Sequence, residues 1–300
     1  MTRTLVSFDW ALKRLLRQKA NFSILEGFLS VLLKRDIVII NLLESESNAD
    51  GGEQKINRVD MLVENEQKER LIIELQYSKE FDYFQRMLFA TSKHLTETLQ
   101  KGNPYQNIKK VFSINLIYFD LGHGSDYVYH GKTEFRGIHQ NDVLGLSVQQ
   151  KELFQKETVY EIYPEYYVIK INNFDDIAQD SLDEWIYYFK NNEVKDEFKA
   201  RGLADVKAQL QFDGLSKEEQ QAYENHEKML LSERGILATA RIEGMAEGRA
   251  EGRAEGMAEG MAEGDKKARI EMVKKMKVNG FAPENIAEMT GLSIDEIMNL

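Results

Sequence analysis

The feature that most constrains the fold of this chain is a pair of apolar segments, residues 57–64 and 70–77, separated by a short polar run. Both segments have the length and the branched apolar residues that are typical of strands. The run between them, residues 65–69, reads NEQKE and suits a hairpin connection. The sequence therefore predicts two antiparallel strands with their loop centred on Gln67.

Three polar side chains lie on this predicted hairpin. Alternate side chains of a strand share a face, so Glu74 and Gln76 point the same way. The hairpin register places Asp60 opposite Glu74, with Cβ atoms about 4.5–5.5 Å apart. Two carboxylates at that separation repel each other unless a cation lies between them, and oxygen ligands suit a hard ion such as Mg²⁺.

Such a site would suit phosphodiester hydrolysis. A metal bound by Asp60 and Glu74 would polarise a phosphoryl oxygen and lower the pKa of a bound water, while Gln76 could orient that water or contact the phosphate. The alternative is that Asp60 ends a strand and Glu74 is a solvated strand residue. A lone acid beside long apolar runs is costly, but the spacing alone leaves both interpretations open.

The rest of the chain shows helical and strand-like apolar patterns. We expect helices near residues 10–16 and 22–33, a buried strand at 37–43, a loop at 45–52, a helix at 80–101, a strand at 111–119, further strands within 124–172 and helices from 175 onward. The apolar face of the helix at 80–101 is predicted to comprise Phe84, Leu88, Thr91, Leu95 and Leu99. Ser216 and Glu219 look like a capping box that opens a charged helix.

An ordered set of segments resembles the PD-(D/E)XK nucleases, specifically the recombination-promoting nuclease and putative transposase family. The segments are SFDWALK at 7–13, LEGFL at 25–29, RVD at 58–60, IELQ at 73–76, FQR at 84–86, GNPY at 102–105 and the strand at 111–119. The resemblance covers about residues 5–240. It implies an α/β fold of the restriction-endonuclease-like order αβββαβ, with a mixed sheet, extra strands and a helical C-terminal region.

The same resemblance implies cleavage of DNA that depends on Mg²⁺ or Mn²⁺, with Asp60, Glu74 and Gln76 as catalytic residues and Asp60 and Glu74 as metal ligands. It also allows Glu26 to be an auxiliary metal ligand, although an ordinary glutamate at the boundary of an apolar helix face is the interpretation that we favour. The chain departs from the superfamily pattern at Gln76, where a lysine is usual. Glutamine offers a dipole where lysine offers a positive charge near the developing phosphorane charge, which puts the rate in question.

Two basic residues follow the site on the next helix. Arg86 and Lys93 lie seven residues apart and could contact DNA phosphates, or could form a solvated basic face. The net charge of −11 argues weakly against a nucleic-acid partner. Residues 1–150 contain 19 basic and 19 acidic residues, however, so the whole acidic excess lies in the second half.

Changes in composition along the sequence divide the chain into four expected parts. We expect a nuclease-like domain at 1–172, a helical extension at 173–242, an E-G-x-A repeat linker at 243–264 and a small helical tail at 265–300. A period of four is close to a helical turn, but glycine costs about 1 kcal/mol per position relative to alanine, so the repeat fits a marginal helix or a flexible spacer. The tail resembles half of a helix-turn-helix, and a small helical pair that forms a homo-oligomer or docks on a partner is the interpretation that we favour over DNA reading.

Composition narrows the location and the function. The chain has no cysteine, which excludes disulfides and thiolate zinc sites and fits a cytoplasmic protein. No apolar run approaches the roughly 20 residues of a membrane-spanning helix, so we expect no membrane partner. The acidic pair and the family resemblance together predict a metal-dependent DNA endonuclease, and the resemblance alone implies a link to recombination, transposition or defence. The alternative is a weak or inactive nuclease-fold protein that binds DNA or acts as an adaptor.

Overall fold

The computed structural model describes residues 5–43, 59–97, 99 and 104–300. It divides into two compact units, residues 1–224 and 225–300, and each is described by itself. The expected loop at 45–52 and the first two residues of the predicted strand at 57–64 lie outside the described residues.

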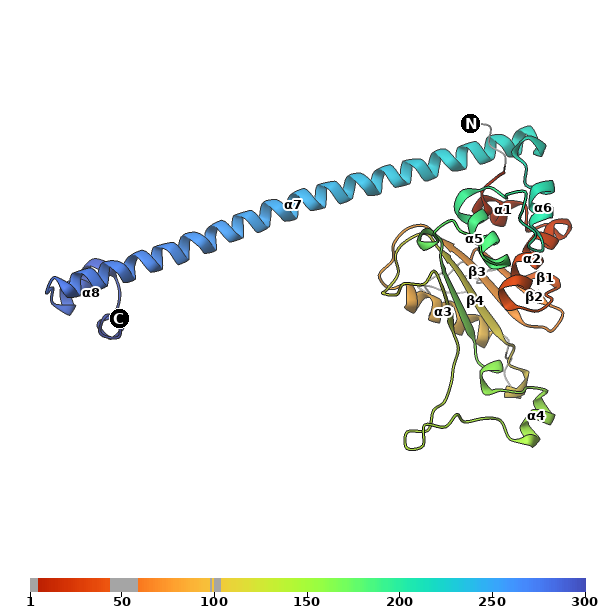
Figure 1. Cartoon of the computed structure of the whole chain (residues 1–300), viewed down its shortest axis with the longest axis horizontal. Coiled ribbons are helices and arrows are strands. Elements are labelled where there is room, and N and C mark those ends of the chain that lie inside the picture. The colour runs from red at the N-terminus through yellow and green to blue at the C-terminus, as the bar shows by residue number, and fades with distance from the viewer. Residues whose placement is uncertain (1–4, 44–58, 98, 100–103) are drawn as a thin grey trace, which may run out of the picture. The chain divides into compact units, whose positions relative to one another are not determined.

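A mixed sheet forms the centre of the first unit (Figure 1). In the described part of the chain it has six strands in the order β1-β2-β3-β4-β6-β5. Their bounds are β1 (Ile39–Leu43), β2 (Met61–Asn65), β3 (Arg70–Gln76), β4 (Val111–Ile117), β5 (Val128–Gly131) and β6 (Glu165–Lys170). β3, β4 and β6 run parallel, and the remaining neighbours are antiparallel. With the helices, this confirms the restriction-endonuclease-like α/β fold.

The hairpin of β2 and β3 has the register that the sequence predicts. Met61 pairs with Ile73 and Glu64 pairs with Arg70, so the positions of each pair are symmetric about Gln67. Asp60 immediately precedes Met61, the first paired residue of β2, and extending the same register by one residue places Asp60 across from Glu74. The parallel pairing of β3 with β4 then fixes Glu74 beside Asn115.

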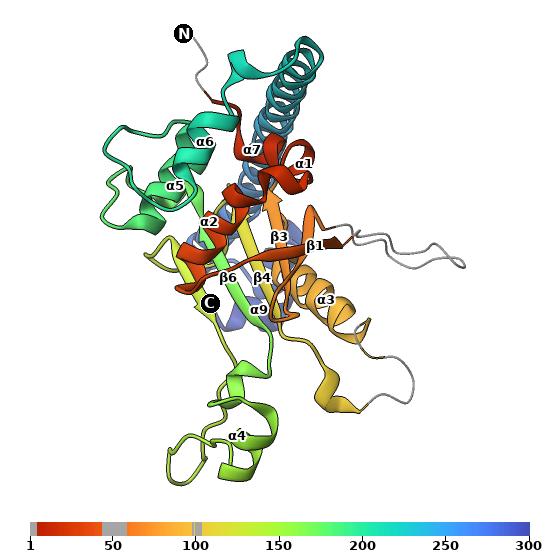
Figure 2. The same ribbon diagram turned by 90° about the vertical axis from the view of Figure 1, so that its right-hand side faces the viewer.

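Helices cover both faces of the sheet. The first unit contains α1 (Phe8–Arg14), α2 (Phe22–Leu33), α3 (Tyr83–Thr96), α4 (Val148–Phe154), α5 (Ser181–Asn191) and α6 (Leu203–Gln209). Short 3₁₀ helices lie at Lys19–Asn21, Tyr105–Asn107, Val159–Glu161, Ile171–Asn173 and Phe212–Gly214. α1, α2, α5 and α6 share one large core with the sheet, whereas α3 packs on the opposite face. α4 lies in an insertion between β5 and β6 that extends away from the sheet (Figure 2).

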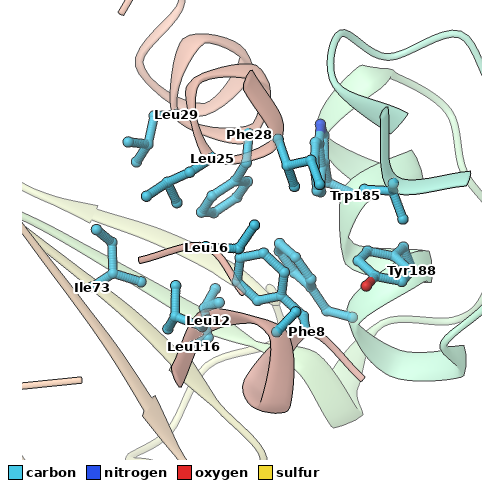
Figure 3. Close-up of a cluster of buried hydrophobic side chains, with 14 of the residues drawn as sticks. Phe8, Leu12, Leu16, Leu25, Phe28, Leu29, Ile73, Leu116, Trp185 and Tyr188 are labelled. Carbon is cyan, nitrogen blue, oxygen red and sulfur yellow. The ribbon is translucent and has the colours of Figure 1, made fainter. Parts of the chain in front are cut away.

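The large core joins the two ends of the first unit. Phe8 of α1, Phe28 of α2 and Trp185 and Tyr188 of α5 pack together above Ile73 and Leu116 of the sheet, as Figure 3 shows. The rings of Phe8 and Phe189 lie 4.5 Å apart between centroids. The compact unit extends to Glu224, because the helices that follow β6 complete the core around α1 and α2.

Three expectations need correction. α3 does not bury Phe84 and Leu88, which are 55% and 59% exposed. It buries the adjacent stripe Tyr83, Met87, Ala90, Thr91 and His94. The segment expected as a buried strand is the edge strand β1, which pairs on one side only and is half exposed. The region 124–172, expected as strands, also contains α4, whose cap Ser147 accepts a hydrogen bond from the N–H of Gln150.

The second unit contains most of α7 (Lys217–Val278), then α8 (Pro283–Thr290) and α9 (Ile294–Met298). The predicted capping box is confirmed at the start of α7, where Ser216 and Glu219 exchange hydrogen bonds. The E-G-x-A repeat is helical throughout, because alanine, glutamate, methionine and arginine favour the helix between the glycines. Val273, Ile286 and Ile297 form a small separate core. No helix in the described ranges is long and apolar enough to cross a membrane.

Candidate active site

Asp60 is held in place by two hydrogen bonds from different elements. The backbone N–H of Leu75 in β3 donates to Oδ2 of Asp60 over 2.8 Å. The guanidinium of Arg17, which follows α1, donates to the carbonyl oxygen of Asp60 over 2.9 Å. The first bond fixes the carboxylate against β3, so the acid at the start of β2 faces the strand that carries Glu74.

Glu74 is a buried acid on the face of β3 that α3 covers. The residue is 5% exposed, and Oε2 lies 3.3 Å from Nη2 of Arg86. Its other oxygen, Oε1, is buried and has no hydrogen-bond partner among the described residues. Burial above all, together with the negative charge of Asp60, raises the pKa of Glu74 to about 8. A buried carboxylate with an open oxygen is a place where a cation would be stabilising.

The carboxyl of Asp60 responds to the same surroundings. Burial raises its pKa, whereas the N–H of Leu75 and the ammonium of Lys13 act in the opposite direction and only partly offset the effect. Both acids therefore have raised pKa values, and each is a source of negative charge near the other. The pair is an all-oxygen donor set of the kind that Mg²⁺ and Mn²⁺ prefer.

Gln76 is held by a neighbouring acid. Its Nε2 donates to Oε1 of Glu80 over 2.9 Å and to the carbonyl oxygen of Ser78 over 3.2 Å. The same Oε1 of Glu80 accepts a hydrogen bond from Nη1 of Arg86 over 2.8 Å. Glu80 is a site residue that sequence reasoning missed. In the sequence, the only feature that could have pointed to Glu80 is its position four residues after Gln76.

Asp9 and Lys13, for which the sequence predicted no role, also lie at the site. Asp9 in α1 is buried, and its Oδ1 lies 2.7 Å from Nζ of Lys13, one helical turn later. Nζ of Lys13 is also 3.9 Å from Oδ1 of Asp60. An acid and a lysine four residues apart are a common surface pair on helices, so their spacing did not single them out.

The other predicted site residues have different surroundings. Oε1 of Glu26 accepts a hydrogen bond from the backbone N–H of Ile39 over 2.8 Å, which ties α2 to the start of β1. Arg86 contacts Glu74 and Glu80, and Lys93 lies partly exposed further along α3. Among residues whose placement is described, no three His, Asp or Glu side chains form a metal-binding cluster. The structure thus brings together Asp60, Glu74, Gln76 and Arg86.

A helix, three antiparallel strands, a helix and a parallel strand, with an acid before β2 facing an acid in β3, define the class of PD-(D/E)XK nuclease cores. The family model of the PD-(D/E)XK nuclease family transposases matches residues 6–240, and the chain belongs to that family. No curated protein and no solved structure gives a significant match. A nuclease-type function follows from the family.

Proposed function

We propose that this protein is a DNA endonuclease that hydrolyses phosphodiester bonds with the help of Mg²⁺ or Mn²⁺. The observation that carries the proposal is the arrangement of Asp60 and Glu74. One carboxylate is fixed by a backbone N–H, and the other has a buried oxygen without a hydrogen-bond partner among the described residues. The family to which the chain belongs supports a nuclease function.

The residues fit a divalent ion. Asp60 and Glu74 would hold it, because the register of β2 and β3 places the two acids across from each other and the charge of Asp60 raises the pKa of Glu74. A bound ion would polarise a phosphoryl oxygen and lower the pKa of a coordinated water. Glu26 as an auxiliary ligand remains a prediction, with one of its oxygens already used by β1.

The other residues prepare the site without themselves holding the ion. Arg86 partly neutralises Glu74 and Glu80, so three charged groups can share a half-buried place. Gln76 uses its amide nitrogen on Glu80 and Ser78, and its carbonyl oxygen can accept a hydrogen bond from a water molecule. In this proposal Gln76 orients the attacking water. Contact of Lys93 with DNA phosphates also remains a prediction.

The direct test is nicking of supercoiled plasmid DNA by the full chain with Mg²⁺ or Mn²⁺. We expect cleavage by the wild-type protein and at least a hundredfold loss in Asp60→Asn and in Glu74→Gln, which remove negative charge at almost constant volume. Glu66→Gln, an exposed acid in the hairpin loop, is the matched control and should retain the wild-type rate. Undiminished nicking by both site variants would refute the assignment.

The hydrogen bonding of Gln76 favours a second function, which is DNA binding without cleavage. Because its amide nitrogen binds Glu80 and no lysine stands at this position, the protein could bind DNA without cutting it, as an adaptor on a nuclease fold. DNA binding with no product under Mg²⁺, Mn²⁺ or Co²⁺ would support this second function. A cytoplasmic location and a role in recombination or defence are proposals that come with the first function.

A further inference from the structure

Lys13 of α1 is a cation that lies close to the acids of the site. We propose that the ammonium of Lys13 contacts the scissile phosphate and supplies the positive charge that Gln76 lacks. This inference rests on the proposed endonuclease function, since it concerns the same site and adds the residue that recognises the reacting phosphate.

The position of Lys13 supports a direct contact. Its Nζ lies 3.9 Å from Oδ1 of Asp60, and Asp60 is itself fixed to β3 by the N–H of Leu75. A phosphate oxygen bound near Asp60 would therefore lie within reach of the ammonium. The side chain of Lys13 is 43% exposed, so a substrate can approach it from solvent.

Asp9 explains why the ammonium stays at the site. The side chain of Asp9 is fully buried, and a buried carboxylate needs a cationic partner. Lys13 provides that partner at 2.7 Å, and this contact holds the head of a long and otherwise mobile side chain. An ammonium has three donors, so Lys13 can bind Asp9 and a phosphate oxygen at the same time. Asp9 is thus a positioning residue for Lys13.

The other cations near the acids are less suited to this role. Arg86 lies between Glu74 and Glu80, at 3.3 Å and 2.8 Å, so two carboxylates already balance its charge. Arg17 donates to the carbonyl oxygen of Asp60 and so serves the backbone. Nζ of Lys13 makes a close contact with Asp9, whereas Oδ1 of Asp60 is 3.9 Å away, so donors of the ammonium remain available on the side of Asp60.

The chemical contribution is electrostatic. During hydrolysis negative charge grows on the phosphoryl oxygens, and a fixed ammonium stabilises that charge more than it stabilises the bound substrate. Loss of one preorganised donor of this kind lowers kcat by about 10²–10³-fold. We therefore expect the Lys13→Gln variant to lose kcat by that factor while its KM changes little.

The decisive experiment removes the positive charge of Lys13 on α1 and introduces a positive charge at position 76 on β3. We would measure kcat for Lys13→Gln, for Lys13→Gln combined with Gln76→Lys, and for Lys19→Gln, an exposed lysine beyond the end of α1, as control. Recovery of at least tenfold in the combined variant, with an unaffected control, supports the proposal. Wild-type kcat in Lys13→Gln overturns it.

Lys13→Gln also leaves the buried Asp9 without its ammonium, so the fold needs a check. The double variant Asp9→Asn/Lys13→Gln removes both charges together, and it should melt close to the wild-type temperature. If Lys13→Gln melts at a lower temperature than the wild type, Asp9→Asn/Lys13→Gln replaces it in the kinetic comparison, both alone and combined with Gln76→Lys. The same two outcomes then decide the question.

A binding measurement separates this inference from the proposed function. In EDTA, where no cleavage occurs, the affinity for a duplex oligonucleotide is measured against salt concentration. Loss of one phosphate contact should reduce the slope of log K against log salt by about 0.9. An unchanged slope overturns the role of Lys13. If wild-type protein fails to cut DNA with any divalent ion, the endonuclease function fails, and this slope still reports on the phosphate contact.

Discussion

The side-chain amide of Gln76 donates a hydrogen bond to the carboxylate of Glu80 over 2.9 Å. The residue at the third motif position therefore holds an acid at the start of the segment that leads into α3, and the same acid binds Arg86. Glu80 links the end of β3 to α3 through side chains alone. Because Glu80 contacts both Gln76 and Arg86, a substitution of Glu80 tests how the charges of the site are balanced.

The Glu80→Gln variant should lower the pKa of Glu74 below its value of about 8. The negative charge of Glu80 raises the pKa of Glu74 directly, and it also competes for the guanidinium of Arg86. Removing that charge leaves Arg86 to stabilise the ionised form of Glu74. NMR titration of ¹³C-labelled glutamate side chains in metal-free protein measures the shift. Asp82→Asn serves as a nearby control, and a Glu74 pKa that stays the same in Glu80→Gln would contradict the assigned coupling.

Without a bound metal, the protein should become less stable as pH rises from about 5 to 8. The pKa of Glu74 is raised to about 8 in the folded state, so the folded protein binds more protons than the unfolded chain over this interval. The stabilisation is fully present below pH 4.5 and is lost as pH rises through 8. Its size is on the order of a few kcal/mol. Urea unfolding at pH 5.5 and 8 should show a smaller pH dependence in Glu74→Gln than in wild type.

Gly27→Ala should destabilise the first unit by about 1–3 kcal/mol. A Cβ at this position would lie 2.5 Å from the carbonyl oxygen of Arg201 and 2.6 Å from Cα of Gly202, so α2 and the start of α6 would have to separate. Gly214→Ala is the matched control, because its Cβ would meet only Gln211 at 3.9 Å. Equal melting temperatures for the two variants would contradict the close approach of these backbones.

A chain that ends at residue 240 should fold and retain nuclease activity, whereas one that ends at 172 should not fold. The longer piece retains Trp185 and Tyr188 of the large core and Tyr223, which packs on Trp10. The shorter piece leaves the apolar faces of α1 and α2 exposed. Far-UV circular dichroism and urea titration distinguish the two. Light scattering of the full chain and of the 1–240 piece also tests whether the C-terminal helices assemble subunits.

Much of the sheet could be predicted because its information is local. The alternation of residues around Gln67 fixed both the register and the facing of Asp60 and Glu74, and a hairpin leaves few alternatives. α3 was harder, since its sequence carries two adjacent apolar stripes. One of them contains Tyr83 and Met87 and the other Phe84 and Leu88, and only packing against the sheet selects the first.

The part of the site that comes from α1 could not be read from the sequence. Asp9 and Lys13 are separated from Asp60 by about fifty residues, and nothing local predicts that the short helix α1 docks at the start of β2. That docking depends on Arg17 and on core contacts with α5. Glu80 was missed for a similar reason, since its role appears only when β3 and α3 are placed together.

The anchoring of the N-terminal segment has a consequence for synthesis on the ribosome. The N–H of Val6 donates to Leu210, the hydroxyl of Tyr188 donates to Val6, and the N–H of Ser7 donates to Tyr223. The segment that presents Asp9 and Lys13 therefore emerges from the ribosome before its partners, which are made roughly two hundred residues later. Under the proposed endonuclease function, an unfinished polypeptide would carry Asp60 and Glu74 without Lys13 in place, so we expect a nascent copy not to cut DNA.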